Sequence, residues 1–361
     1  MHGSGATGEL FGVSLTSGTT EATEAGADEP EHSAGRVSCR PGGRAGRTVV
    51  VLVLVGAGAL IPLLGPRAAL AGTGEAGAPG AGGVALLRAV LLAALCVPVG
   101  ELFVGWLARR VPGASQEAPP SWAPWAAVAG FVAASGLASV VATGNLVPYS
   151  PADLDVGGLY ATRDGRLALL EVNAFAAAGL LALSRRPAAQ TLPLAALVVA
   201  EALRAHPATE DSPLVGTGLT LVHLTCAALW AGGLLHVLRT LRTRAWRSTR
   251  AGTTLLGRYA RVAALLLAAV TATGVWSTLR RLPPGTALDQ LTETAYGRAL
   301  LAKVLLVTAV AALALRARQR LRHPAGGRPD AGAFARAEVA VLAAVVAVSA
   351  LLTALPVPIR W

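Results

Sequence analysis

Few residues of this chain have side chains that could do chemistry, and several of them share one apolar run. The segment Thr220–Arg239, "TLVHLTCAALWAGGLLHVLR", contains His223 and His236. The two histidines are 13 positions apart, so one helix would separate them by about 20 Å. They therefore cannot bind the same metal ion. His236 stands beside a cluster of arginines and is predicted to mark the point where the helix leaves the membrane.

His223 begins a helical stripe that continues through Cys226, Trp230 and the second glycine of Gly232–Gly233. Two interpretations fit this stripe. In the first it is a packing seam, where small glycines allow a neighbouring helix to approach closely. In the second it is a metal site, because neutral imidazole binds copper or zinc and a thiolate binds Cu(I). His206, at the end of the preceding apolar run, is then the predicted second ligand near the outer membrane face.

Two carboxylates could complete or neutralise such a site. An ionisable side chain inside a membrane costs about 2.5–3.5 kcal/mol on insertion scales, so it needs a partner or a function. Glu101 and Glu201 lie in apolar runs and are candidate second ligands. Glu201 has an alternative partner in Arg204, which lies one helical turn further on. The chain has no metal-ligand spacing such as HExxH and no catalytic motif in a suitable context, so no enzyme is predicted.

The composition is that of a membrane protein. Of 361 residues, 53% are hydrophobic and 14% are charged, whereas soluble domains have about 25% charged residues. The formal charge of +11 comes mostly from arginines that stand between apolar runs, a pattern that sets membrane orientation and argues against nucleic-acid binding. Met1 is the only methionine, which excludes a path for Cu(I) lined by thioethers. The three cysteines have no disulfide or CxxC pattern.

The apolar runs predict an all-α, polytopic transmembrane helix bundle of about nine helices. The runs lie at about 48–64, 84–108, 123–143, 167–184, 192–205, 214–238, 255–279, 299–315 and 337–355. A spanning helix needs about 20 residues, so the fifth run is the weakest candidate. If all nine runs span, every large arginine cluster falls on one side, and the positive-inside rule places the N-terminus in the cytoplasm.

The first run has an alternative interpretation. Its basic start, apolar centre and "ALA" at 69–71 resemble a signal peptide with a cleavage site. Cleavage would leave eight helices without changing the orientation of the others, although the long polar segment before the run argues against it. Residues 1–47 are predicted to form a disordered cytoplasmic tail, followed by N-terminal membrane helices over 48–206.

A series of motifs in the second half of the chain resembles a known family. They are, in order, "RAHPAT" (204–209), "LVHLTCAALWAGGLL" (221–235), "RYARVAALLLAAVTATGVWSTL" (258–279), "LTETAYGRALLAKVLLVTAVAALALRARQR" (291–320) and "FARAEVAVLAAVVAVSALLTALPVP" (334–358). Together they resemble the copper resistance protein D family (CopD, with the related YcnJ-type proteins) over roughly residues 200–358. The resemblance implies a CopD-like four-helix membrane domain at 207–361.

The same resemblance implies copper transport or handling at the cell membrane by a multi-pass protein, with the copper ion as cargo. His223 matches the family's histidine, and His206 matches with altered neighbours. The expected metal site is therefore His206 and His223, with Cys226, Glu201 and Glu101 as further candidates. The expected structural residues are Trp230, Gly232 and Gly233 in the helix, and Tyr296, Gly297, Arg298 and Lys303 at a loop-to-helix entry.

The lipid bilayer, copper and an external copper-binding CopC-like protein are the expected partners, with no nucleic acid. A second hypothesis is a membrane accessory factor for the assembly of a copper-dependent oxidase, without bulk transport. A third is a haem-associated or purely structural membrane protein. Haem binding would require histidines that face His223 and His236, and only His206 is available within an apolar run.

Overall fold

The computed structural model describes residues 56, 58–115, 117–144, 150, 154–206, 212–247, 249–281, 285, 287–322 and 331–355. The chain divides into two units, residues 1–46 and 47–361, and all described residues belong to the second unit. The predicted tail at 1–47 lies outside the described residues.

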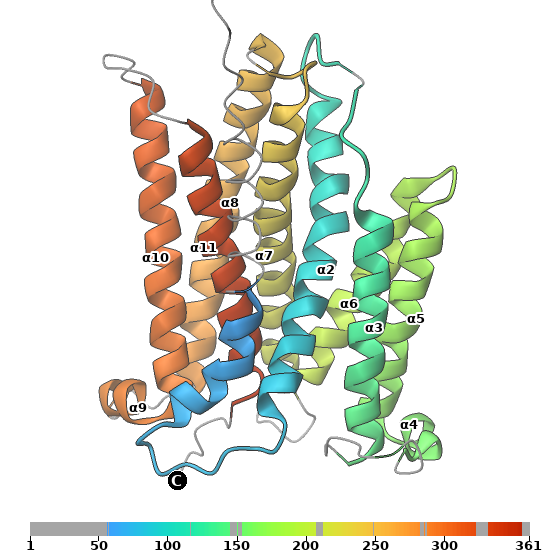
Figure 1. The fold of residues 1–361 in the computed structure, drawn as a ribbon, viewed down its shortest axis with the longest axis vertical. Helices are drawn as coiled ribbons and strands as arrows, with labels where there is room; N and C mark the ends of the chain where they lie inside the picture. Colours follow the sequence, from blue (N-terminus) through green and yellow to red (C-terminus); the bar gives the residue numbers. More distant parts are fainter. Residues whose placement is uncertain are drawn as a thin grey trace, which may run out of the picture. The chain divides into compact units, whose positions relative to one another are not determined.

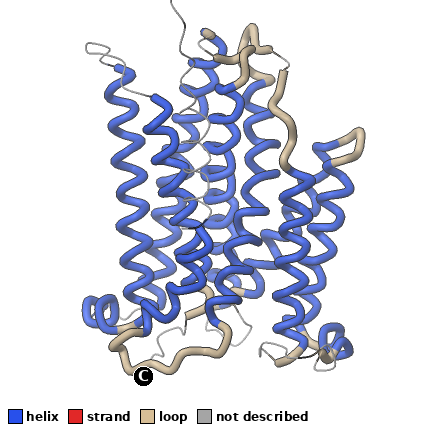
Figure 2. Tube along the Cα trace, in the orientation of Figure 1, coloured by secondary structure: helices blue, strands red, loops and turns tan. Residues whose placement is uncertain are grey.

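The described part of the chain consists of helices joined by loops and contains no strand (Figures 1 and 2). A short apolar helix, Gly58–Leu70, precedes the numbered elements. The other elements are, in chain order, α2 (Ala81–Ala108), α3 (Ala123–Ala142), α4 (Val156–Ala161), α5 (Arg163–Ala182), the 3-10 helix η2 (Pro187–Gln190), α6 (Thr191–Arg204), α7 (Pro213–Arg242), α8 (Arg250–Arg281), α9 (Ala287–Glu293), α10 (Ala295–Arg322) and α11 (Ala331–Leu352).

The prediction of an all-α, polytopic bundle is confirmed, with fewer long helices than the nine expected spans. Among the described residues, six helices are long and apolar enough to cross a membrane: α2, α3, α5, α7, α8 and α10. The fifth apolar run forms α6, which has 14 residues and is about 21 Å long. That is shorter than the hydrocarbon core of about 30 Å. Gly58–Leu70 and the apolar stretch Ala343–Leu352 of α11 are also shorter.

Local sequence signals explain where several helices begin. Thr162 caps α5, with its hydroxyl accepting a hydrogen bond from the Gly165 amide. Proline occupies the first turn of α3 and of α7, where its missing amide hydrogen costs nothing. Gly144, just after α3, has a positive φ of 67°, a conformation that glycine adopts without steric cost.

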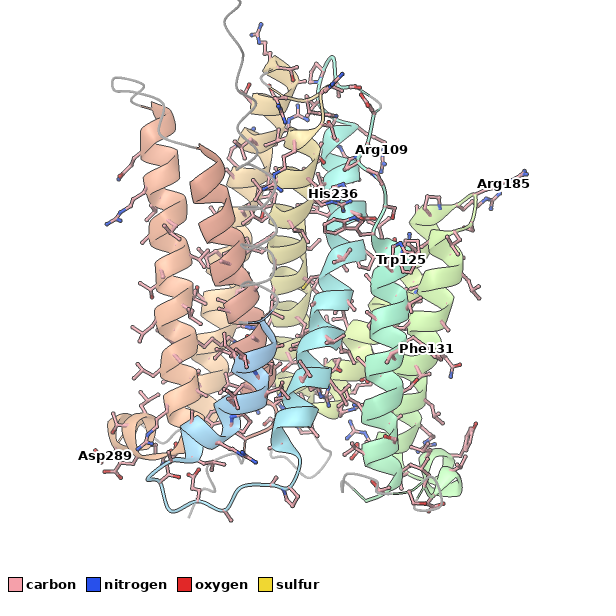
Figure 3. The ribbon with its side chains drawn as sticks, in the orientation of Figure 1. Arg109, Trp125, Phe131, Arg185, His236 and Asp289 are labelled. Atoms are coloured by element: carbon pink, nitrogen blue, oxygen red, sulfur yellow. The ribbon has the colours of Figure 1, made fainter. Side chains whose placement is uncertain are left out.

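The two ends of the bundle differ in their charged residues. Figure 3 shows Arg109 and Arg185 towards one end and Asp289 at the other. Arg109 follows α2 and Arg185 follows α5, so these two helices run in the same direction. The positive-inside rule assigns the end with the arginines to the cytoplasm. We call it the inner end and the opposite end the outer end.

Helix α2 is central to the packing, because it contacts α3, α6, α7, α8 and α11. Its closest approach is to α7, at Gly100 and Gly232. A Cβ added to Gly232 would lie 2.8 Å from the carbonyl carbon of Cys96 and 3.1 Å from the Gly100 Cα. The absence of side chains therefore lets the two backbones touch, as small residues do in membrane proteins. Gly233, the other half of the pair, packs against Tyr259 and Phe103.

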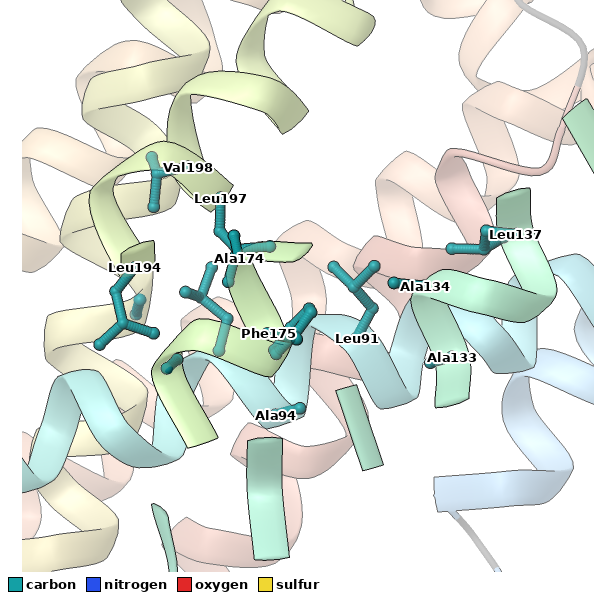
Figure 4. Close-up of a cluster of buried hydrophobic side chains, with 13 residues drawn as sticks. Leu91, Ala94, Ala133, Ala134, Leu137, Ala174, Phe175, Leu194, Leu197 and Val198 are labelled. Atoms are coloured by element: carbon teal, nitrogen blue, oxygen red, sulfur yellow. The ribbon is translucent and has the colours of Figure 1, made fainter. Parts of the chain in front are cut away.

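An apolar core joins α2 to α3, α5 and α6 (Figure 4). Leu91, Phe175 and Leu197 are almost completely buried in it. The Phe175 ring packs directly against Gly130, where any side chain would overlap it. The core holds α6 against the rest of the bundle. This helix ends at Arg204, two residues before His206.

Candidate functional site

His223 lies on α7, opposite α8. Its Nδ1 atom is 2.9 Å from Thr273 Oγ1, and the Thr273 hydroxyl is also 2.7 Å from the carbonyl oxygen of Ala269. A hydroxyl has one proton to donate, and a carbonyl can only accept. Thr273 therefore donates to Ala269, and His223 Nδ1–H donates to Thr273. This tautomer leaves the lone pair on Nε2, the atom that a neutral imidazole uses to bind a metal.

The surroundings of His223 include a second polar residue, Lys303 of α10. Gly274 of α8 leaves space beside the imidazole, since an added Cβ would lie 3.6 Å from His223 Cε1. The Lys303 side chain interacts electrostatically with His223. The sequence suggested an interfacial role for this lysine at the start of a helix, but Lys303 lies eight residues beyond Ala295, the first residue of α10. That is more than two turns.

His206 lies just beyond α6 and packs on the preceding turns of α7. Its side chain is buried, and its Nε2 atom is 2.8 Å from Thr220 Oγ1. The imidazole fills the space beside Gly216, where a Cβ would overlap it. Thr220 is one turn before His223 on α7, so the two histidines approach neighbouring turns of the same helix. Their hydrogen bonds differ, because His206 bonds within the α6–α7 pair and His223 bonds to α8.

Glu201 pairs with an arginine that the sequence analysis did not consider. Both of its carboxylate oxygens are 2.6 Å from Arg88 Nη1 of α2. Arg204, the alternative partner suggested by helix spacing, instead lies 2.9 Å from Glu171 of α5. Glu171 is completely buried and also interacts with Glu201. We call Arg88, Glu171, Glu201 and Arg204 the outer ion network. Its formal charges sum to zero when all four groups are ionised.

Glu101 belongs to a separate cluster near the inner end. Its carboxylate accepts hydrogen bonds from Arg239, at 3.0 Å, and from the Ser121 hydroxyl and Trp122 amide, at 2.6 and 2.7 Å. The Arg239 guanidinium also lies 3.6 Å above the Trp122 ring. His236 Nδ1 is 4.0 Å from the same carboxylate. Because His236 and His223 are about 20 Å apart along α7, Glu101 is also far from His223. Figure 3 shows His236 in the half of the bundle that contains Arg109.

The remaining sequence candidates have structural contacts. Cys226 is a half-buried free thiol one turn after His223. The Trp230 ring is buried, and its carbonyl accepts a 2.6 Å hydrogen bond from the Tyr259 hydroxyl. At the outer end, Gly297 donates its amide to Thr294 Oγ1 at 3.0 Å.

The segment after Gly58–Leu70 is tied to the start of α10. Arg298 donates to the carbonyl oxygens of Ala71 and Thr292, at 2.7 and 2.8 Å. Tyr296, two residues earlier, is buried. Arg298 thus connects α10 to a loop more than 220 positions earlier in the chain.

No group of three or more histidine, cysteine, aspartate or glutamate side chains is placed to hold a metal ion within the described ranges. His206 contacts α7 at Thr220. His223 lies one turn further along α7, and Cys226 lies one turn after His223. The structure does not bring Glu101 to them, and it places Glu201 in the outer ion network.

Comparison with known proteins gives the family. The family model described as "Copper resistance protein D" matches residues 253–352. Over these residues the chain is similar to the copper resistance protein D family. The family resemblance predicted from the sequence is therefore confirmed, and this is a copper-resistance-related, multi-pass membrane protein. Neither the comparison with curated proteins nor that with solved structures found a match.

The CopD match covers most of α8 and all of α9, α10 and α11. It therefore contains Thr273 and Lys303, the two groups beside His223, but neither His206 nor His223. Sequence reasoning missed Thr273 as a partner, because a threonine in an apolar helix carries no signal of what it faces. It also missed Arg88 as a partner of Glu201. An arginine inside an apolar run should have signalled a buried acidic partner.

Proposed function

We propose that this protein transports or handles copper across the cytoplasmic membrane, and that it acquires the ion in the outer half of the bundle at a site built on His223. The CopD match supports the involvement of copper. The observation that supports His223 is its hydrogen bond to Thr273. Metal-binding histidines usually donate their second ring N–H to an acceptor that fixes the tautomer, and Thr273 is such an acceptor.

His206 and Cys226 are the proposed additional ligands. Cys226 is one turn from His223 on α7, and its thiolate would suit Cu(I). His206 would join them by exchanging its bond to Thr220 for the metal, since Thr220 is only one turn from His223. Glu201 and Glu101 are not included, because Arg88 and Arg239 already pair with their carboxylates. A CopC-like copper-binding protein outside the membrane is the proposed donor of the ion.

A copper accumulation assay in cells tests this function. We expect His206→Ala combined with His223→Ala to abolish the copper accumulation that the wild-type protein supports. His236→Ala is the matched control, since it removes an imidazole from the same helix about 20 Å away, and we expect it to retain accumulation. Unchanged accumulation in the double variant, at equal protein levels in the membrane, would refute the site.

The same cells distinguish the alternative roles. Loss of the activity of a copper-dependent oxidase with normal bulk copper accumulation would favour the accessory role in oxidase assembly. A haem absorption spectrum of the purified protein tests the haem-associated role. The side chains that the structure records against His223 and His236 are Thr273, Lys303, Glu101 and Arg239, which provide no second axial histidine.

A further inference from the structure

Lys303 contrasts with three arginines of the bundle that pair with glutamates. Arg88 and Arg204 pair with glutamates in the outer ion network, and Arg239 pairs with Glu101. No carboxylate pairs with Lys303 among the residues that the structure describes. A lone cation inside a membrane bundle is costly and is a functional candidate for that reason.

The helical register of α10 places Lys303 on the face that packs into the bundle. Leu306, Val307 and Val310, at three, four and seven positions after Lys303, pack in an apolar cluster with residues of α7 and α8. Positions with this spacing share one face of a helix. The neighbouring positions 301, 304 and 305 carry side chains that are 41%, 54% and 63% exposed, so they form the outward face. Lys303 therefore extends the inward stripe towards the outer end.

The membrane level of Lys303 matches that of His223. Lys303 lies eight residues from the outer end of α10, and His223 lies ten residues from the outer end of α7. At 1.5 Å per residue these distances are about 12 and 15 Å. Thr273 lies eight residues before the outer end of α8. Thr273, His223 and Lys303 therefore lie at a similar depth on three helices. The electrostatic interaction of Lys303 with His223 agrees with this register.

We propose that Lys303 is a specificity-determining residue that makes the His223 site favour monovalent copper over divalent copper. This inference rests on the proposed function of His223. A fixed positive charge repels a bound cation in proportion to the charge of that cation. The repulsion energy of Cu²⁺ is therefore twice that of Cu⁺ at the same position. The Cys226 thiol, one turn from His223, favours the same ion, because thiolates select Cu(I).

The proposal gives a quantitative relation that does not depend on the distance between Lys303 and the ion. Removing the charge raises the affinity for a monovalent ion by some factor, and it raises the affinity for a divalent ion by the square of that factor. For example, a gain of about 10-fold for the monovalent ion implies about 100-fold for the divalent ion. A purely structural role of Lys303 would change both affinities by a similar factor.

The test measures Ag⁺ and Zn²⁺ binding to the full-length protein purified in detergent, because neither ion changes its oxidation state. Lys303→Met keeps the length of the side chain and removes the charge, whereas Lys303→Arg keeps the charge. We expect Lys303→Met to raise the affinity for both ions, with the larger gain for Zn²⁺, and Lys303→Arg to preserve the wild-type preference. Equal gains for the two ions, or no gain, would overturn the proposal.

His223→Ala separates this result from the proposed function. If Ag⁺ binding is lost in His223→Ala while Lys303→Met leaves the preference between ions unchanged, only the role of Lys303 is refuted. If Ag⁺ binding survives in His223→Ala, the site itself is refuted, and the role of Lys303 falls with it.

Discussion

The contact between Gly100 and Gly232 is the tightest point between α2 and α7, and Gly232→Ala tests how far the bundle depends on it. The added Cβ would lie 2.8 Å from the carbonyl carbon of Cys96 and 3.1 Å from the Gly100 Cα. Favourable contacts between carbon atoms lie at about 3.5–4.0 Å. The Cys96 carbonyl oxygen lies closer still to the added Cβ. The helices would therefore have to separate by more than about 0.7 Å, because the opposing atoms are backbone atoms that cannot rotate away.

The size of the effect follows from the absence of a flexible neighbour. Overpacking a well-packed core costs about 1–3 kcal/mol. Since only a backbone shift can relieve this overlap, we expect Gly232→Ala to cost about 2–3 kcal/mol of unfolding free energy, in the upper part of that range. The Glu101–Arg239 pair lies on the same two helices, so separating them should also lengthen that ion pair.

The control is Gly218→Ala on the same helix. A Cβ added to Gly218 meets nothing within 4 Å, and alanine favours helix over glycine by up to about 1 kcal/mol. Unfolding of both variants in mixed detergent, followed by circular dichroism, would give the two free energies. We expect destabilisation by Gly232→Ala alone. Equal stability of the two variants would show that α2 and α7 are not in backbone contact at Gly232.

Three further predictions follow from single contacts. Thr273→Val removes the acceptor that orients His223 and should lower Ag⁺ affinity by about 10–100-fold with the thermal stability of the protein kept; an unchanged titration would refute the orienting role. Arg88→Met should cost about 3–5 kcal/mol in the same unfolding assay, because it leaves Glu201 buried without its partner. Adding Glu201→Gln should restore much of this loss, and strictly additive losses would contradict the pairing. Tyr259→Phe, which removes the hydrogen bond to the Trp230 carbonyl, should cost about 1 kcal/mol.

The helices could be predicted from the sequence because a membrane leaves the backbone little choice. A spanning segment must satisfy its own hydrogen bonds, so a long apolar run becomes a helix. The run at 214–238 forms α7, Pro213–Arg242, and the run at 84–108 forms α2, Ala81–Ala108. The ends extend beyond the runs because helices continue into polar residues at the membrane surface, and hydropathy does not detect these.

The partners of the buried charges could not be predicted in the same way. Helix spacing suggested Arg204 for Glu201, but the actual partner, Arg88, is 113 positions away. Which helices are neighbours depends on packing between small residues such as Gly100 and Gly232, and a single sequence does not encode that pairing visibly. For the same reason the sequence alone places Lys303 only at a helix entry. Its spacing from Leu306 and Val310 was visible, but the helix that this stripe faces was not.

Two ion pairs connect α2 to two different neighbouring helices. Arg88 joins α2 to α6, and Glu101 joins it to α7; the two positions are 13 residues apart, or about 20 Å. Two ion pairs at different levels hold α2 against its neighbours. Its backbone also contacts α7 close to the Glu101–Arg239 pair. By contrast, only 11% of the apolar window of α8 is buried, against 33% for α2 and α7. The α8 helix, which carries Thr273, is therefore far less enclosed by the bundle than α7, which carries His223.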